Sequence, residues 1–289
     1  MSVLRCLSIC SGAGSSRSEL SLPTCLWYQV ALQEIRHPRW FLQIALRVGL
    51  VFVTISFAKI VNAQWGTIKG TVTLNRGVAR LPVIVRKGDP AVKDAAVCSA
   101  ADLPDDSVLV DPRSNGLANV VVYLANKPAV IHPDLVTSKR QDVEFQVKGC
   151  RFVPHVLVVR TDQDVHILSD DFIAHNVHPS SQKNRISASI FLDRKPIVDT
   201  LRQPERLPFK VTCDIHPWME AYWVVLDHPY VSVTSEKGEF EILNLPEGDH
   251  TFRIWHEKAG YLDKSYNVKV KGGVNNVGPI TFAAEKVEE

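Results

Sequence analysis

The sequence predicts an all-β protein, and two observations support this prediction. Beyond residue 64, apolar and polar side chains alternate with a period of two in many short runs, which Gly, Pro, Asn and Asp interrupt at close spacing. Stretches with the 3.6-residue period of an amphipathic helix are almost absent, and the best candidate is 197–201, just after Pro196. Such a pattern is typical of β-sandwiches and barrels. The clearest runs are 67–74, 118–124, 143–147, 155–160, 239–245, 251–255 and 266–270.

The charge of the chain excludes one class of function. The 289 residues include 33 Lys and Arg and 31 Asp and Glu. Six of the basic and two of the acidic residues lie in 1–63, so 27 basic and 29 acidic residues remain in 64–289. A near-neutral chain without clusters of Lys and Arg among aromatic residues lacks the positive surface that nucleic acids require. We therefore expect no nucleic-acid partner.

Residues 1–63 are typical of a signal peptide or leader. Three arginines precede an eleven-residue apolar run (48–58), and Val61 and Ala63 occupy the two positions that a signal peptidase inspects. An uncleaved anchor is the alternative, but a membrane span needs about 20 apolar residues. We expect an exported protein of the periplasm or cell envelope, with no membrane span in the mature chain.

The mature chain divides into three blocks. The central block, 140–228, contains six of its nine histidines and two of its three cysteines, whereas 64–139 and 229–289 contain more turn signals. Read together, the flanks resemble the carboxypeptidase-regulatory (prealbumin-like) β-sandwich, through GTIKGTVTL, ANVVVYL and GEFEILNLPEGDHTFRIWHE. We expect the central block to be a second sandwich inserted in, or adjacent to, this outer one. Three consecutive small β-domains are the alternative.

The loop CDIHPWM carries the strongest chemical signal. Cys213, His216 and Met219 lie at C-x2-H-x2-M spacing between two apolar runs, and the segment HNVH, which begins at His175, lies upstream. One thiolate, two imidazoles and a thioether together form a trigonal site with a weak axial ligand, a set that suits copper cycling between Cu(I) and Cu(II). Zinc is the second choice, but it prefers four firm N, S or O ligands.

The central block resembles a cupredoxin, a blue-copper domain of the amicyanin and plastocyanin kind. The resemblance covers 144–227 and depends on the strand PHVLVV, the segment HNVH and the loop CDIHPWM; Thr161-Asp162-Gln163 departs from it, because the family usually has a Gly turn there. It implies a Greek-key sandwich and one mononuclear type 1 copper site. The ligands that it implies are His175, Cys213, His216 and Met219.

The same resemblance implies roles for the neighbours of the ligands. Asn176 would tie the two ligand segments together by hydrogen bonds. The partly exposed ring of His216, with Pro217 and Trp218, would form the electron-transfer surface. His178 lies three residues from His175, and on a strand this offset points to the other face.

The three mature cysteines predict one disulfide. Once Cys213 is a metal ligand, Cys98 and Cys150 remain, and an oxidising compartment favours their pairing. Two small buried thiols are the alternative.

The leading hypothesis is a one-electron carrier that docks with a redox protein partner. We do not expect an enzyme, because Thr212 and Asp214 stand where a multicopper oxidase has histidines beside the cysteine. Exported proteins labelled methylamine utilization are similar in arrangement, a label that implies little about substrate. The alternatives are a cell-surface binding or structural module stiffened by a metal, and a copper sequestration or delivery protein.

Overall fold

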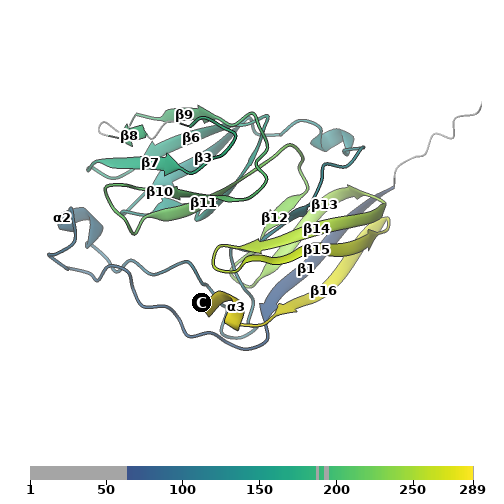
Figure 1. Ribbon diagram of the computed structural model, residues 1–289, viewed down its shortest axis with the longest axis horizontal. Coiled ribbons are helices and arrows are strands. Elements are labelled where there is room, and N and C mark those ends of the chain that lie inside the picture. Colours follow the sequence, from purple (N-terminus) through teal and green to yellow (C-terminus); the bar gives the residue numbers. More distant parts are fainter. Residues whose placement is uncertain (1–63, 187–188, 192–194, 289) are drawn as a thin grey trace, which may run out of the picture. The chain divides into compact units, whose positions relative to one another are not determined.

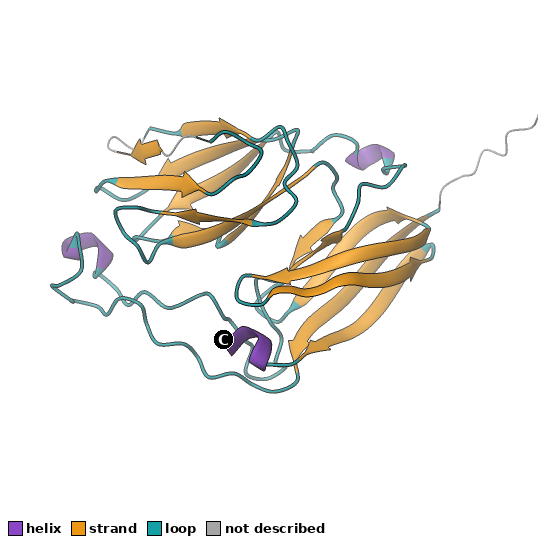
Figure 2. Ribbon diagram, in the orientation of Figure 1, coloured by secondary structure: helices purple, strands orange, loops and turns teal. Residues whose placement is uncertain are grey.

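The computed structural model describes residues 64–186, 189–191 and 195–288, and these residues form an almost entirely β structure (Figures 1 and 2). The predicted all-β fold class is therefore confirmed. The leader predicted at 1–63 lies outside the described residues. No helix in the described part of the chain is long and apolar enough to cross a membrane.

Two sheets, which we call the outer sandwich, combine strands from both ends of the described chain. One sheet has the order β13-β1-β16 and the other β12-β2-β14-β15. Strands that precede and follow the central block thus pair directly, so the central block is inserted between them in sequence. The bounds are β1 (Trp65–Leu74), β2 (Val121–Leu124), β12 (Val231–Val233), β13 (Glu239–Pro246), β14 (Gly248–His256), β15 (Gly260–Val270) and β16 (Gly273–Phe282), and the helix α3 (Glu285–Glu288) follows.

Two further sheets form the central sandwich. Their strand orders are β5-β11-β10-β7-β8 and β4-β3-β6-β9. The best helical candidate, 197–201, does not form a helix: β9 pairs antiparallel with β6 at the edge of its sheet, with alternating half-buried and exposed residues. The bounds are β3 (Asp142–Val147), β4 (Phe152–Val153), β5 (Val156–Arg160), β6 (Asp164–Ser169), β7 (His175–Pro179), β8 (Ser189–Phe191), β9 (Ile197–Thr200), β10 (Phe209–Thr212) and β11 (Glu220–Leu226).

Strands β2 and β11 each contribute to two hydrophobic cores. In β2, Val122 packs in the core of the outer sandwich and Val121 in a small third cluster. In β11, Trp223 lies in the core of the central sandwich, and Val224 lies in the same third cluster with Trp255 of β14. Successive side chains of a strand point to opposite faces, and both faces are covered here. This explains why β2, although it lies in the predicted alternating run 118–124, is apolar along its whole length, as is most of β11.

Between β1 and β2, a stretch that we call the crossing segment (residues 85–103) belongs to the central sandwich. Val85, Cys98 and Leu103 pack in its core. The crossing segment contains the short helix α2 (Ala95–Cys98), and Cys98 forms a disulfide with Cys150. This corrects the expectation that all of 64–139 belongs to the outer sandwich. The crossing segment has no period-two run, and the predicted pairing of Cys98 with Cys150 is the sequence signal that joins it to the central block.

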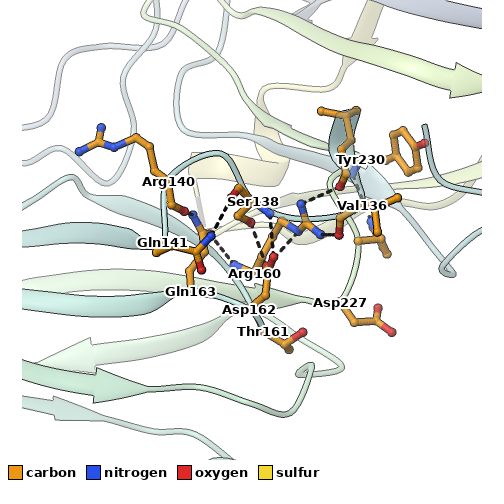
Figure 3. Close-up of polar contacts among 12 residues, drawn as sticks. Val136, Ser138, Arg140, Gln141, Arg160, Thr161, Asp162, Gln163, Asp227 and Tyr230 are labelled. Carbon is orange, nitrogen blue, oxygen red and sulfur yellow. Dashed lines mark hydrogen bonds and ion pairs between the residues drawn. The ribbon is translucent and has the colours of Figure 1, made fainter. Parts of the chain in front are cut away.

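The turn between β5 and β6 holds the chain that leads into the central sandwich. Asp162 accepts hydrogen bonds from the Ser138 N–H (2.7 Å) and hydroxyl (2.9 Å), and the Arg160 guanidinium donates to the carbonyl oxygens of Leu135 and Val136, at 2.9 Å each (Figure 3). Leu135 ends the short 3-10 helix η1 (Pro133–Leu135). The residues that replace the Gly turn of the cupredoxin pattern therefore anchor this connection.

Candidate metal centre

The loop between β10 and β11 is closed by its own backbone. The Cys213 N–H donates to the Met219 carbonyl at 3.2 Å, and the Met219 N–H donates to the His216 carbonyl at 2.9 Å. Pro217 is exposed at the tip. These bonds turn the Cys213, His216 and Met219 side chains inward, where all three are at most 2% exposed.

The structure brings three of the predicted ligands together. One ligand atom of each of His175, Cys213 and His216 lies within 4.8 Å of those of the other two, and all three residues are buried. The Cys213 Sγ lies 3.8 Å from the His216 Nδ1, and the two imidazole centroids are 4.6 Å apart. Met219 packs in the same core cluster as Cys213. The β7 strand supplies His175, and the β10–β11 loop supplies the rest.

The two imidazoles share one arrangement. The His175 Nε2 lies 3.0 Å from an Asp171 carboxylate oxygen, and the His216 Nε2 lies 3.0 Å from an Asp94 carboxylate oxygen. A carboxylate can only accept, so each Nε2 carries a proton, and each Nδ1 is the nitrogen that is left to face a metal. The His175 Nδ1 is buried and has no hydrogen-bond partner. Metal-binding histidines in proteins show this same pattern, and the orphaned nitrogen fits a metal ligand.

Asp171 is held as a carboxylate at the base of the site. Besides His175, it accepts the backbone N–H groups of Gly149 (2.7 Å) and Cys150 (2.8 Å). Burial raises the pKa of Asp171, but these hydrogen bonds to the charged form outweigh burial and place its pKa below the usual value. In turn, burial lowers the pKa of His175, but Asp171 and Cys213 outweigh it and raise that pKa to about 9.

The surroundings of the Cys213 thiol stabilise its thiolate form. Burial raises its pKa, but the neighbouring His175 imidazole and the backbone N–H groups of Asn176, His216 and Ile215 lower it further, so that the pKa lies below its ordinary value. The thiolate is the form of cysteine that binds metal. A buried thiolate beside two imidazole nitrogens and a thioether is a donor set for copper.

Asn176 and His178 flank the site in different ways. The Asn176 amide donates to the Asp214 carboxylate at 2.6 Å and accepts the Asp214 N–H at 2.7 Å, so it links the two segments that carry the ligands. His178 is exposed, and its Nδ1 lies 3.0 Å from the Asp214 carboxylate, away from the buried ligands.

The expectation that the ring of His216 is partly exposed is wrong. Its side chain is fully buried, because Asp94 of the crossing segment covers Nε2. Burial is the main reason that the pKa of His216 lies below its usual value, and the bond to Asp94 opposes this. Trp218 is half-buried: its ring centroid lies 5.2 Å from that of His216, and its indole N–H donates to the Cys150 carbonyl at 3.2 Å.

Sequence reasoning missed both carboxylates. Asp171 lies four residues before His175, and an acid near a candidate ligand is a usable signal. Asp94 lies 122 positions before His216, and no local pattern joins them. Cys150 also lies within 4.8 Å of Asp171 and His175, but its sulfur is bonded to Cys98 and offers no thiolate.

Comparisons with known proteins gave limited likenesses. No family model matches the chain, and the search of curated proteins found no match. Among solved structures, the copper-containing nitrite reductase of Thermus scotoductus SA-01 is 20% identical over 29% of this chain and 22% of its own, with a TM-score of 0.27. A purple cupredoxin of Nitrosopumilus maritimus is 16% identical over 29% of this chain and 99% of its own (TM-score 0.25). An oxidized amicyanin variant is 16% identical over 36% of this chain and 90% of its own (TM-score 0.27).

Proposed function

We propose that this chain binds one copper ion in a mononuclear type 1 site and transfers single electrons. The observation that carries the proposal is the pair of imidazoles whose Nε2 atoms are fixed by carboxylates, while the buried Nδ1 of His175 has no partner and that of His216 lies 3.8 Å from the Cys213 sulfur. Met219 would be the fourth, weaker donor. When bound, copper supplies a one-electron couple between Cu(I) and Cu(II).

The protein supplies a rigid, dry frame for that couple. The ligands come from one strand and one hydrogen-bonded loop, and they pack against the apolar core of the central sandwich. The soft thiolate suits Cu(I), the imidazoles serve both oxidation states, and the thioether is a weak donor that helps Cu(II). Zinc fits less well, because one of the four donors would be a thioether.

The proposed setting is the cell envelope, with a redox protein as partner. The Cys98–Cys150 disulfide fits an oxidising compartment, and the leader at 1–63 is the sequence basis for export. We further propose that the protein is a carrier and not an enzyme, since Thr212 and Asp214 flank Cys213 and leave no second metal site linked to the cysteine.

Copper sequestration or delivery is a second candidate, favoured by the full burial of His216. A carrier usually presents one ligand edge to its partner, whereas a storage site gains from a closed one. The two functions differ in rate: a carrier exchanges electrons faster than copper, and a storage or delivery protein releases copper to a chelator or acceptor faster than it exchanges electrons.

Redox titration of the full chain loaded with one equivalent of copper tests the proposal. We expect one reversible one-electron wave and a reduced form that retains its copper in the presence of a moderate chelator. Retained copper without a reversible wave would reject the electron carrier, and rapid loss of Cu(I) to the chelator would favour delivery. A matched preparation loaded with zinc is the control for metal-independent signals.

A further inference from the structure

Asp94 makes this site a closed one, in contrast to a ligand loop whose histidine is open to solvent. It belongs to the crossing segment, yet its carboxylate lies 3.0 Å from the Nε2 of a proposed ligand, His216. The Asp94 side chain is 33% exposed and the His216 side chain 0% exposed, so this carboxylate lies between the imidazole edge and solvent.

Locally, the Asp94 carboxylate forms only a loose ion pair with Lys93, at 3.9 Å, which is longer than its 3.0 Å contact with His216. It stands at the N-cap of α2, where Asp is among the preferred residues because its side chain usually accepts a backbone N–H. Here the side chain makes no such hydrogen bond. Its backbone is in the left-handed region (φ 55), which Asp and Asn tolerate better than most residues. The carboxylate is therefore directed to His216 instead of the helix.

A covalent tether holds the crossing segment at this place. Cys98, four residues after Asp94, is bonded to Cys150. The Cys150 N–H donates to Asp171, the carboxylate on the other imidazole, and the Cys150 carbonyl accepts the indole N–H of Trp218. One disulfide thus connects both carboxylates and the loop that carries the metal ligands.

We propose that Asp94 is a positioning residue for the copper site, an inference that rests on the proposed function. By accepting the Nε2–H, Asp94 fixes the tautomer of His216 that leaves Nδ1 for the metal. The negative acceptor also makes the imidazole a stronger donor, which favours Cu(II) over Cu(I). Finally, the crossing segment closes the imidazole edge to small reagents in solution.

The hydrogen bond can be tested without copper. In the full chain, nitrogen-detected NMR of the imidazoles should show His216 protonated at Nε2, with this proton protected from exchange with water. Asp94→Ala should remove the protection or shift the tautomer. Asp102→Asn is the matched control, because Asp102 lies in the same crossing segment and accepts only the Lys87 N–H, at 2.7 Å. An unprotected or Nδ1-protonated His216 in the unaltered chain would overturn the inference.

The effect on the metal is tested in the copper-loaded chain. Asp94→Asn keeps the side-chain shape and the tolerance of left-handed backbone but removes the charge. We expect it to lower Cu(II) affinity by about 10-fold or more. With Cu(I) affinity unchanged, each tenfold loss raises the reduction potential by about 59 mV. Asp94→Glu should partly restore both quantities.

The outcomes separate this inference from the proposed function. Equal potentials and equal Cu(II) affinities in Asp94→Asn and Asp102→Asn would overturn the role of Asp94 while leaving the copper site in place. A chain that binds no copper would reject the proposed function, and the NMR measurement would still decide whether Asp94 fixes the His216 tautomer.

Discussion

Two buried histidines, one in each sandwich, show what makes an unpaired ring nitrogen a binding site. His175 in the central sandwich and His256 in the outer one are both fully buried, and each has one ring nitrogen without a hydrogen-bond partner. Around His175 lie a thiol, a second imidazole and a carboxylate, whereas among the described residues His256 belongs to no cluster of metal-binding side chains. The orphaned atom alone is therefore weak evidence, and the converging donors carry the proposal.

The pKa values of the two histidines show the same contrast. The Asp171 carboxylate and Cys213 outweigh burial at His175 and raise its pKa to about 9. At His256, burial acts first, His155 and Lys258 add to it, and the pKa falls to about 4. The central sandwich surrounds its buried imidazole with partners that favour the charged form, whereas the outer sandwich buries an imidazole whose low pKa keeps it neutral near pH 7.

The largest expected effect is on Cu(II) affinity, when each of the two buried imidazoles is removed in turn. His175→Ala should lower Cu(II) affinity by more than about 100-fold, since loss of even an outer partner of a ligand commonly costs 10- to 100-fold. His256→Ala should leave copper affinity unchanged, although it opens a cavity in the outer sandwich. Competition with a calibrated chelator measures both. Equal losses in the two variants would contradict the comparison.

The next effect concerns the covalent tether, which only the central sandwich has. The Cys98–Cys150 disulfide closes a loop with a sequence separation of 52, and in the chain-entropy model such a loop stabilises the fold by about 4 kcal/mol. A double variant, Cys98→Ser with Cys150→Ser, should lose most of this in urea unfolding. Both cysteines of the unaltered, air-oxidised protein should resist alkylation; two readily alkylated thiols would exclude the disulfide.

His256 should make stability depend on pH. Because its folded pKa of about 4 lies below the ordinary 6.5, the unfolded chain takes up a proton first as the pH falls. Its contribution is complete above pH 6.5 and is lost as the pH falls towards 4, by about 3 kcal/mol. Urea unfolding at pH 7 and pH 4.5 measures this. His256→Gln should flatten the dependence relative to the unaltered chain, and an equally steep loss in that variant would assign the effect to other groups.

The smallest expected effects are shifts of the reduction potential. They distinguish Met219, a weak ligand, from His178, a neighbour that is not a ligand. Met219→Leu should keep copper and raise the reduction potential, because the axial donor that helps Cu(II) is lost. His178→Ala should change little, since His178 is exposed and bonded to Asp214. Voltammetry of the two variants checks this pair. A larger shift for His178→Ala than for Met219→Leu would reverse the assignment.

Local patterns in the sequence were enough to predict several strands and the metal loop. Alternation with a period of two located seven of the sixteen described strands, and C-x2-H-x2-M spacing selected the residues that the structure buries together. The features that the sequence did not predict depend on contacts between residues far apart in the chain. Asp94 reaches the site from 122 positions away in the sequence, so no local spacing revealed that His216 is covered. Residues 197–201 are short and half-buried at a sheet edge, where pairing with β6 decides the conformation.

The visible spectrum of the full chain with one equivalent of Cu(II) tests the central claim most directly. A Cys213 thiolate bound to Cu(II) gives an intense charge-transfer band, so the protein should be coloured, and Cys213→Ser should lose the band because a hydroxyl oxygen lacks the sulfur orbital. Stoichiometric Cu(II) binding without this band, or a band that persists in Cys213→Ser, would contradict the assignment of a type 1 copper site.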